Sequence, residues 1–175
     1  MYIIDDTEAS LLIDDFTKEQ SIQITKVAGN TQNLFVDTFE FVERDCYVQN
    51  QRRLSFQFAY NKGVFFLRIK GAVNKGDTIY FLFDNDKLIE KVITETFAFH
   101  RVEYAEAFEL RNEEVKLFAT VFLKKWKITK RASNTFIVGG FIDNKYVGQY
   151  PTSEEGQYLL LSMARQLIKQ VIYHS

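Results

Sequence analysis

Basic and aromatic side chains are concentrated in one short segment of this chain. Residues 124–131 contain five lysine or arginine residues, no acidic residue and the only tryptophan of the chain. Cations neutralise phosphates and an exposed ring stacks on a base, so this combination favours binding of single-stranded nucleic acid. It also fits a solvated strand end whose tryptophan packs inward and whose lysine stems cover apolar surface. The candidate surface comprises Lys124, Lys125, Trp126, Lys127, Lys130 and Arg131.

Acidic residues are concentrated near the start of the chain. Between residues 1 and 19, Lys18 is the only basic residue. Such a segment would meet a basic partner surface or mimic phosphate, or it would form a solvated cap over one end of the fold, near the basic segment. The candidate acidic surface comprises Asp5, Asp6, Glu8, Asp14 and Asp15.

Residues for nucleophilic catalysis are sparse. The chain has one cysteine, Cys46, and two histidines, His100 and His174. No local motif brings Cys46 and His100 together as a thiolate–imidazole pair. There is no Gly-x-Ser-x-Gly elbow and no phosphate-binding or dinucleotide-binding motif. A buried structural cysteine is therefore the simpler interpretation of Cys46.

Carboxylates that would suit a metal-dependent nuclease occur in two places. Asp84, Asp86 and Glu90 surround an expected turn, and Glu114 and Lys116 precede an expected strand. Catalytic divalent cations need such clustered oxygen ligands. The run at 84–86 is also explained by a tight turn, and it lacks the glycine and distal glutamate of an EF-hand. We expect no catalytic residue, metal site or cofactor, and a nuclease remains a distant alternative.

Short alternating strands are expected to position these residues. The side chains of Leu54, Phe56, Phe58 and Tyr60 would share one face, which is typical of a half-buried strand. A turn at 61–63 leads into a returning strand over residues 64–70. Further strands are expected at 79–83, 88–99, 135–142 and 145–150, with turns at 74–77, 84–86 and 143–144. Residues 102–110 fit a strand better than the helix that their composition also allows.

An amphipathic helix is predicted over residues 152–173. Thr152 and Glu155 would form its capping box, with Pro151 just outside. We expect its apolar stripe to pack on the aromatic face of the sheet. Gly139 and Gly140 would then mark a bulge or a close backbone approach beneath it. The stripe comprises Leu160, Met163, Ala164, Leu167, Ile168, Val171 and Ile172.

These elements predict one α+β domain over residues 1–175. It would contain an irregular segment (1–33) with a short N-terminal helix, antiparallel strands (34–150) in a meander or partly closed barrel rich in Phe and Tyr, and the C-terminal helix. A bent sheet closed by a helix resembles pleckstrin-homology-like and helix-grip domains in architecture alone. One side of the short N-terminal helix would carry Leu11, Leu12, Ile13 and Phe16.

Bulk properties narrow the possible functions. The net charge of −1, the single cysteine and the lack of a secretory leader or an apolar run of about 18 residues indicate a soluble cytoplasmic protein with no membrane span. The leading hypothesis is a non-catalytic module that contacts a protein partner through exposed strand edges or the two charged segments. The alternatives are a single-stranded nucleic-acid binder using residues 124–131, and a carrier of an apolar ligand between sheet and helix. Close packing of the aromatic rings favours a filled interior over the carrier. The sequence does not specify an oligomeric state.

Overall fold

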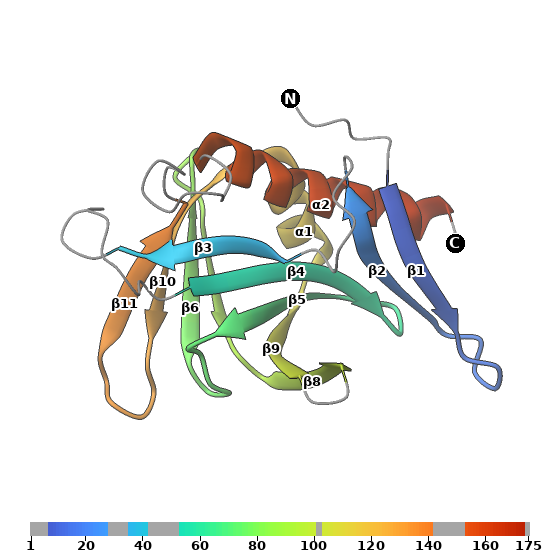
Figure 1. Cartoon of the computed structure of the whole chain (residues 1–175), viewed down its shortest axis with the longest axis horizontal. Coiled ribbons are helices and arrows are strands. Elements are labelled where there is room, and N and C mark those ends of the chain that lie inside the picture. Colours follow the sequence, from blue (N-terminus) through green and yellow to red (C-terminus); the bar gives the residue numbers. More distant parts are fainter. Residues whose placement is uncertain (1–6, 28–34, 42–52, 101–102, 142–152, 174–175) are drawn as a thin grey trace.

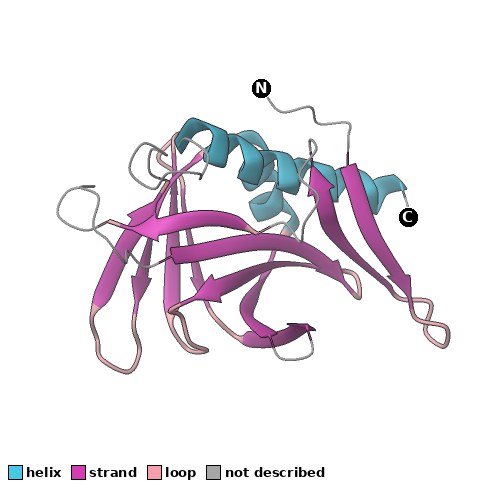
Figure 2. Ribbon diagram, in the orientation of Figure 1, coloured by secondary structure: helices cyan, strands magenta, loops and turns pink. Residues whose placement is uncertain are grey.

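The computed structural model describes residues 7–27, 35–41, 53–100, 103–141 and 153–173. Antiparallel strands and two helices, α1 and α2, make up most of these residues (Figures 1 and 2). The helices are α1 (Asn112–Thr120) and α2 (Ser153–Tyr173). The first six strands are β1 (Thr7–Ile13), β2 (Gln20–Val27), β3 (Val36–Glu40), β4 (Arg53–Asn61), β5 (Val64–Gly71) and β6 (Thr78–Phe83). The other five are β7 (Leu88–Val92), β8 (Glu95–His100), β9 (Glu103–Leu110), β10 (Leu123–Thr129) and β11 (Phe136–Gly140).

The strands form one curled sheet that resembles half of a barrel (Figure 2). Their spatial order is β7-β6-β10-β11-β3-β4-β5-β9-β8, and β2 pairs with β4 and carries β1 on its other side. Each of these pairings is antiparallel. In Figure 1 the two helices lie in the hollow and along the top of the curl. The predicted fold class, an antiparallel α+β arrangement closed by a C-terminal helix, is confirmed.

The central hairpin forms where the alternation predicted it, but β4 is buried on both faces and is not half-buried, because Ser55, Gln57 and Ala59 are buried as well. β4 and β5 pair along their whole length, from Leu54 opposite Gly71 to Asn61 opposite Val64. The connecting turn requires positive φ angles, which are 51° at Lys62 and 83° at Gly63. Glycine adopts such angles without a steric penalty, so Gly63 fixes the two-residue turn and with it the register of both strands.

Aromatic rings fill the interior of the half-barrel. The ring of Phe118, on α1, lies 5.2 Å from those of Phe58 and Phe81 and 5.0 Å from that of Phe83, each in an edge-to-face arrangement. Such pairs stabilise a core beyond the area that they bury. Phe81 also contacts Phe56 and Phe108. Rings therefore occupy the centre of the sheet, in the space that an apolar ligand would need.

Helix α1 was not predicted: Glu114 and Lys116 precede a strand, β10, as expected, but they lie on this helix. Glu114 Oε1 accepts a hydrogen bond from the backbone N–H of Arg111 at 2.8 Å, which closes the helix N-terminus. Val115 and Phe118 then lie one turn apart on the buried side. Lys116 is exposed on the opposite side, so Glu114 and Lys116 point in different directions.

Helix α2 lies where the apolar stripe predicted it, and most of that stripe is buried. Leu160, Met163, Ala164 and Leu167 are at most 2% exposed, and the helix packs on α1, β2 and β4. One side chain differs from the expected stripe: Ile172, at its end, is exposed. Gln166, a polar residue beside the stripe, is buried. The predicted capping box at 152 and 155 lies outside the described side chains.

The N-terminal helix prediction was wrong, because residues 7–13 form strand β1. β1 pairs with β2 from Thr7 opposite Val27 to Ile13 opposite Gln20. Asp14 begins the turn between the two strands: its Oδ1 accepts hydrogen bonds from the N–H groups of Phe16 and Thr17 at 2.8 Å each. An aspartate that caps a turn in this way favours a hairpin over helix propagation.

The strand predicted over residues 88–99 is divided into two. β7 pairs with β6, whereas β8 pairs with β9 at the opposite edge of the sheet. The chain crosses between these edges at Ile93 and Thr94, whose N–H groups donate to Asp77 and Ala107 respectively. β9 confirms the strand interpretation of residues 103–110, and the predicted hairpin around 143–144 lies outside the described residues. No helix in the described part of the chain is both long and apolar enough to span a membrane.

Candidate functional site

The pairing register of β7, β6, β10 and β11 places lysines and apolar side chains together on the outer face of these strands. Lys125 lies opposite Leu82 on β6, and Lys127 lies opposite Tyr80 on one side and Val138 on the other. Directly opposed residues of an antiparallel pair point to the same face. We call this surface the lysine–aromatic face. It comprises Tyr80, Leu82, Leu88, Lys125, Lys127, Phe136 and Val138.

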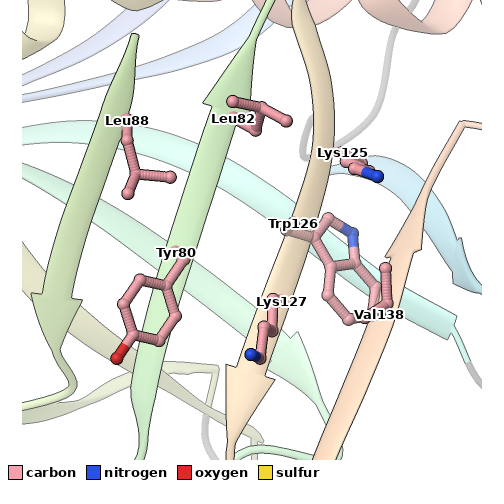
Figure 3. Close-up of a pocket in the computed structure, with 7 residues that line it drawn as sticks. All are labelled: Tyr80, Leu82, Leu88, Lys125, Trp126, Lys127 and Val138. Carbon is pink, nitrogen blue, oxygen red and sulfur yellow. The ribbon is translucent and has the colours of Figure 1, made fainter. Parts of the chain in front are cut away.

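The lysine–aromatic face contains a shallow pocket of about 330 Å³. Figure 3 shows six residues of the face around it, with Trp126 between the two lysines of β10. Leu88 and Phe136 expose 60% and 63% of their surfaces at its margins. Val92, on the same side of β7 as Leu88, is 51% exposed. Exposed or half-buried apolar side chains therefore lie on β7, β6 and β11, on both sides of the lysines of β10.

Lys127 is held against two rings of the same face. Its Nζ lies 4.7 Å from the ring centroid of Phe136 and 5.9 Å from that of Tyr80. These cation–π contacts hold the ammonium group in place while leaving it open to solvent. Partial burial raises the pKa of Tyr80, and the neighbouring Glu90 carboxylate raises it further, so the phenol stays protonated and remains a hydrogen-bond donor.

Trp126 has a structural role that the sequence left open. Its side chain is 2% exposed, and its Nε1–H donates to Thr38 Oγ1 at 2.8 Å. The indole lies against Gly139, directly opposite it on β11, where a Cβ atom would collide with the ring and with the carbonyl of Phe39. Gly139 thus permits a close approach by Trp126 rather than by α2. The indole is not available to stack on a base.

The Lys130 side chain and the backbone N–H of Arg131 form hydrogen bonds within the fold. Lys130 Nζ donates to Asp77 Oδ2 at 2.6 Å and to the carbonyl of Ala72 at 3.1 Å. Asp77 also accepts from the N–H groups of Arg131 and Asn74. This cluster ties the loop between β5 and β6 to the end of β10. Of the five basic residues predicted as a surface, Lys124, Lys125, Lys127 and Arg131 are exposed, and Lys130 is partly buried in an ion pair.

The Asp77 cluster predicts a pH-dependent stability. Burial of Asp77 acts to raise its pKa, but the hydrogen bonds from Lys130, Arg131 and Asn74 outweigh burial and hold the pKa below its ordinary value of 3.8. A carboxyl group with a lowered folded-state pKa stabilises the fold above its unfolded pKa. That stabilisation is lost as pH falls through the folded value.

We therefore expect Asp77→Asn to lower the free energy of unfolding by about 1.5–3 kcal/mol at pH 7, the range for a hydrogen bond to a charged group. The loss should shrink as pH falls below about 4, where the carboxyl of the unfolded chain becomes protonated, and disappear below the lowered folded-state pKa. Urea unfolding at pH 7, 5 and 3 measures both effects. The matched control is Asp15→Asn, at an exposed carboxylate. An equal loss in both variants would contradict the assigned role of Asp77.

The acidic segment lies at the opposite end of the molecule from the basic one. Asp14 and Asp15 are exposed in the turn between β1 and β2, which is at the right of Figure 1, whereas β10 and β11 are at the left. The two charged segments are therefore not neighbours within one copy. Glu8 lies on β1, and Asp5 and Asp6 fall outside the described residues.

The carboxylates considered for metal chemistry do not converge. Asp84 and Asp86 lie in the turn between β6 and β7, while Glu114 is buried on α1. The Glu114 Oε1 atom lies 2.5 Å from Lys91 Nζ and 3.3 Å from Arg111 Nε. Burial acts to raise the pKa of Glu114, but these two partners hold it below its ordinary value. In the described part of the chain, no three His, Cys, Asp or Glu side chains are close enough to share a metal ion.

Glu114 also lies beside a second, more polar groove between β7 and α1, of about 480 Å³, lined by residues that include Lys87, Glu90, Glu113 and Lys116. Charges of both signs line it, and the buried Glu114 carboxylate is already paired with Lys91 and Arg111. Cys46, considered above as a nucleophile, and His174 fall outside the described residues, and His100 is placed only as the last residue of β8.

Sequence reasoning missed the apolar half of the lysine–aromatic face. Residues 79–83 are a continuous run of apolar and aromatic residues, so the run predicts a strand without distinguishing its inner face from its outer face. Ile79, Phe81 and Phe83 are indeed fully buried, but Tyr80 and Leu82 are only half-buried. The signal was present in the alternation with Thr78 and Tyr80, whose polar groups favour the solvent side.

Comparisons with protein-family models, curated proteins and solved structures found no significant match to this chain.

Proposed function

We propose that this chain is a non-catalytic binding module that holds a protein partner on its lysine–aromatic face. The observation that carries the proposal is the exposure of Leu88 and Phe136 beside the pocket, at 60% and 63%. A contiguous exposed apolar patch rimmed by polar residues is typical of protein interaction sites. Aromatic side chains are also enriched at the centres of such interfaces.

The partner chemistry follows from the residues of the face. The pocket would take one large apolar side chain, and Lys125 and Lys127 would pair with carboxylates on either side of it. Lys127 is already held against Phe136, so a carboxylate can bind it at a lower cost in side-chain entropy. Hydrogen bonds between an ammonium and a carboxylate are among the stronger ones in proteins. The expected ligand is thus an acidic segment that presents an aromatic or large aliphatic residue.

Single-stranded nucleic acid is the second candidate, because lysines beside exposed rings on an open sheet face also suit base stacking. Two observations favour a protein partner. The Trp126 ring is buried and so cannot stack on a base, and the Lys130 ammonium is paired with Asp77 and so is not free to bind a phosphate.

Selection from a random displayed-peptide library tests the proposal. Peptides that bind the immobilised chain should be enriched in Asp or Glu next to an aromatic or large aliphatic residue. Their affinity should fall by at least about tenfold for the double variant Lys125→Glu/Lys127→Glu, since each replacement puts a repulsive charge at the contact. The matched control is Lys75→Glu/Lys116→Glu, which makes the same charge change at exposed positions away from the pocket.

Two results would overturn the proposal. One is a set of selected peptides whose affinity for Lys125→Glu/Lys127→Glu equals their affinity for the wild-type chain. The other is tight binding of a labelled single-stranded oligonucleotide at physiological salt, with an affinity that falls steeply as salt rises and is lost in the same variant. That second result would identify the face as a nucleic-acid surface.

A further inference from the structure

The turn between β1 and β2 carries a second exposed apolar surface, at the opposite end of the molecule. Phe16 is 96% exposed, which leaves its ring almost completely in solvent. Leu12 and Ile13 on the adjoining strand expose 70% and 47% of their surfaces. Exposed carboxylates at Asp14, Asp15 and Glu19 surround these residues. We call residues 11–19 the hairpin tip.

The hairpin tip has a defined conformation that presents Phe16. Asp14 Oδ1 accepts hydrogen bonds from two successive N–H groups of the turn, and Lys18 N–H donates to the Asp14 carbonyl at 2.8 Å. The backbone hydrogen bonds from Thr17 and Phe16 also hold the pKa of Asp14 below its ordinary value, so the tip stays anionic at neutral pH. An ordered turn loses less conformational entropy on binding than a flexible one.

The hairpin tip has the chemistry that the lysine–aromatic face requires. It presents one aromatic ring flanked by carboxylates, and the face offers an apolar pocket flanked by Lys125 and Lys127. A cavity of about 150 Å³ accommodates benzene, so the pocket of about 330 Å³ has room for a phenylalanine ring. Opposite charges on the two surfaces would align Phe16 with the pocket during encounter.

The two surfaces cannot meet within one copy. The hairpin β1–β2 and the strands β10 and β11 lie at opposite ends of the long axis in Figure 1. Contact between them must therefore join two copies. Because each copy has one of each surface, the contact joins unlike surfaces, and such contacts continue from copy to copy into chains or closed rings.

We propose that the partner of the lysine–aromatic face is a second copy of this chain, whose hairpin tip inserts Phe16 into the pocket. This inference rests on the proposed function, because it assigns an occupant to the same face. A hairpin tip buries less area than the roughly 800 Å² per partner of a stable interface. The assembly is thus weak and reversible, and its mean mass rises with protein concentration.

Complementary variants test this head-to-tail contact. Phe16→Asp removes the inserted ring but keeps the face, whereas Lys125→Glu/Lys127→Glu disables the face but keeps the tip. By sedimentation velocity, each variant alone should be monomeric at concentrations where the wild-type chain associates. An equimolar mixture should form a complex of two chains that does not grow further, because only one competent tip and one competent face remain. The control Ile172→Asp, at an exposed apolar residue on α2, should associate as the wild type does.

Three results would overturn the inference. The first is a wild-type chain that stays monomeric at every accessible concentration. The second is association that persists in either variant alone, as pairing between two β1 edges would give. The third is two monomeric variants whose mixture also stays monomeric. In all three cases the proposed function stands if peptide binding is still lost in Lys125→Glu/Lys127→Glu. The proposed function would be contradicted if Lys125→Glu/Lys127→Glu bound the selected peptides as well as the wild-type chain does.

Discussion

Phe118→Ala is expected to lower the free energy of unfolding by about 3–5 kcal/mol, the range for removing a phenylalanine ring from a packed core. The ring is 2% exposed and makes edge-to-face contacts with Phe58, Phe81 and Phe83. These contacts join α1 to β4 and β6, so the substitution leaves a cavity where helix and sheet meet. Urea denaturation followed by circular dichroism measures the change.

Phe16→Ala is the matched control for this prediction. It removes the same ring from a position that is 96% exposed, and it should change the free energy of unfolding by less than about 0.5 kcal/mol, the usual surface value. Similar losses in the two variants would show that Phe118 does not occupy the centre of the core. If the control remains fully folded, any loss of self-association on changing Phe16 reflects the contact and not the fold.

Helix α1, which carries Phe118, shows why part of the fold was not predicted. The helix has only nine residues, and its buried positions extend over little more than one turn, too few to establish a helical period. Its first turn is closed by Arg111 and Glu114 rather than by the Ser, Thr, Asp or Asn that usually begin a helix. Isolated helices of this length are unstable, so packing of Phe118 among the sheet rings determines the conformation.

The N-terminal hairpin was mispredicted for a related reason. Leu11, Leu12 and Ile13 are consecutive apolar residues, and a run of this kind fits a helix side as well as a strand. Its strand conformation comes from pairing with β2, and β2 is itself held by β4 through pairs such as Ile22 with Tyr60. Contacts between residues far apart in sequence therefore decide the conformation of this segment.

By contrast, β4, β5 and α2 were predictable because each carries a full period of buried residues and a defined boundary. The candidate site was predictable only in part. Charge density identified the lysines of β10, but the pairing of Lys130 with Asp77 depends on a contact across 53 residues. Tyr80, Phe136 and Val138 come from two other strands and meet Lys127 only through the strand register. A single sequence identifies the residue types of such a face, but it does not show which of them lie beside one another in space.

Leu167→Ala is expected to lower the free energy of unfolding by about 2–5 kcal/mol. Leu167 is fully buried on the side of α2 that packs into the half-barrel, one turn from Met163 and Ala164. Its loss would weaken the contacts of α2 with β2 and β4, and β2 in turn carries β1. The variant should therefore loosen the β1–β2 hairpin as well as the helix.

Amide hydrogen exchange separates that effect from a purely local one. In Leu167→Ala, protection should fall in β2 and α2 more than in β6 and β10, which pair with neither β2 nor β4. The matched control is Ile172→Ala, which shortens a side chain that is 68% exposed near the end of the same helix and should cost less than about 0.5 kcal/mol. A loss below that value for Leu167→Ala would mean that this side of α2 is not core, and the stripe would then be a contact surface for another molecule. A loss of unfolding free energy within the expected range, together with a fall in amide protection that is confined to β2 and α2, would instead show that α2 supports the hairpin whose tip carries Phe16.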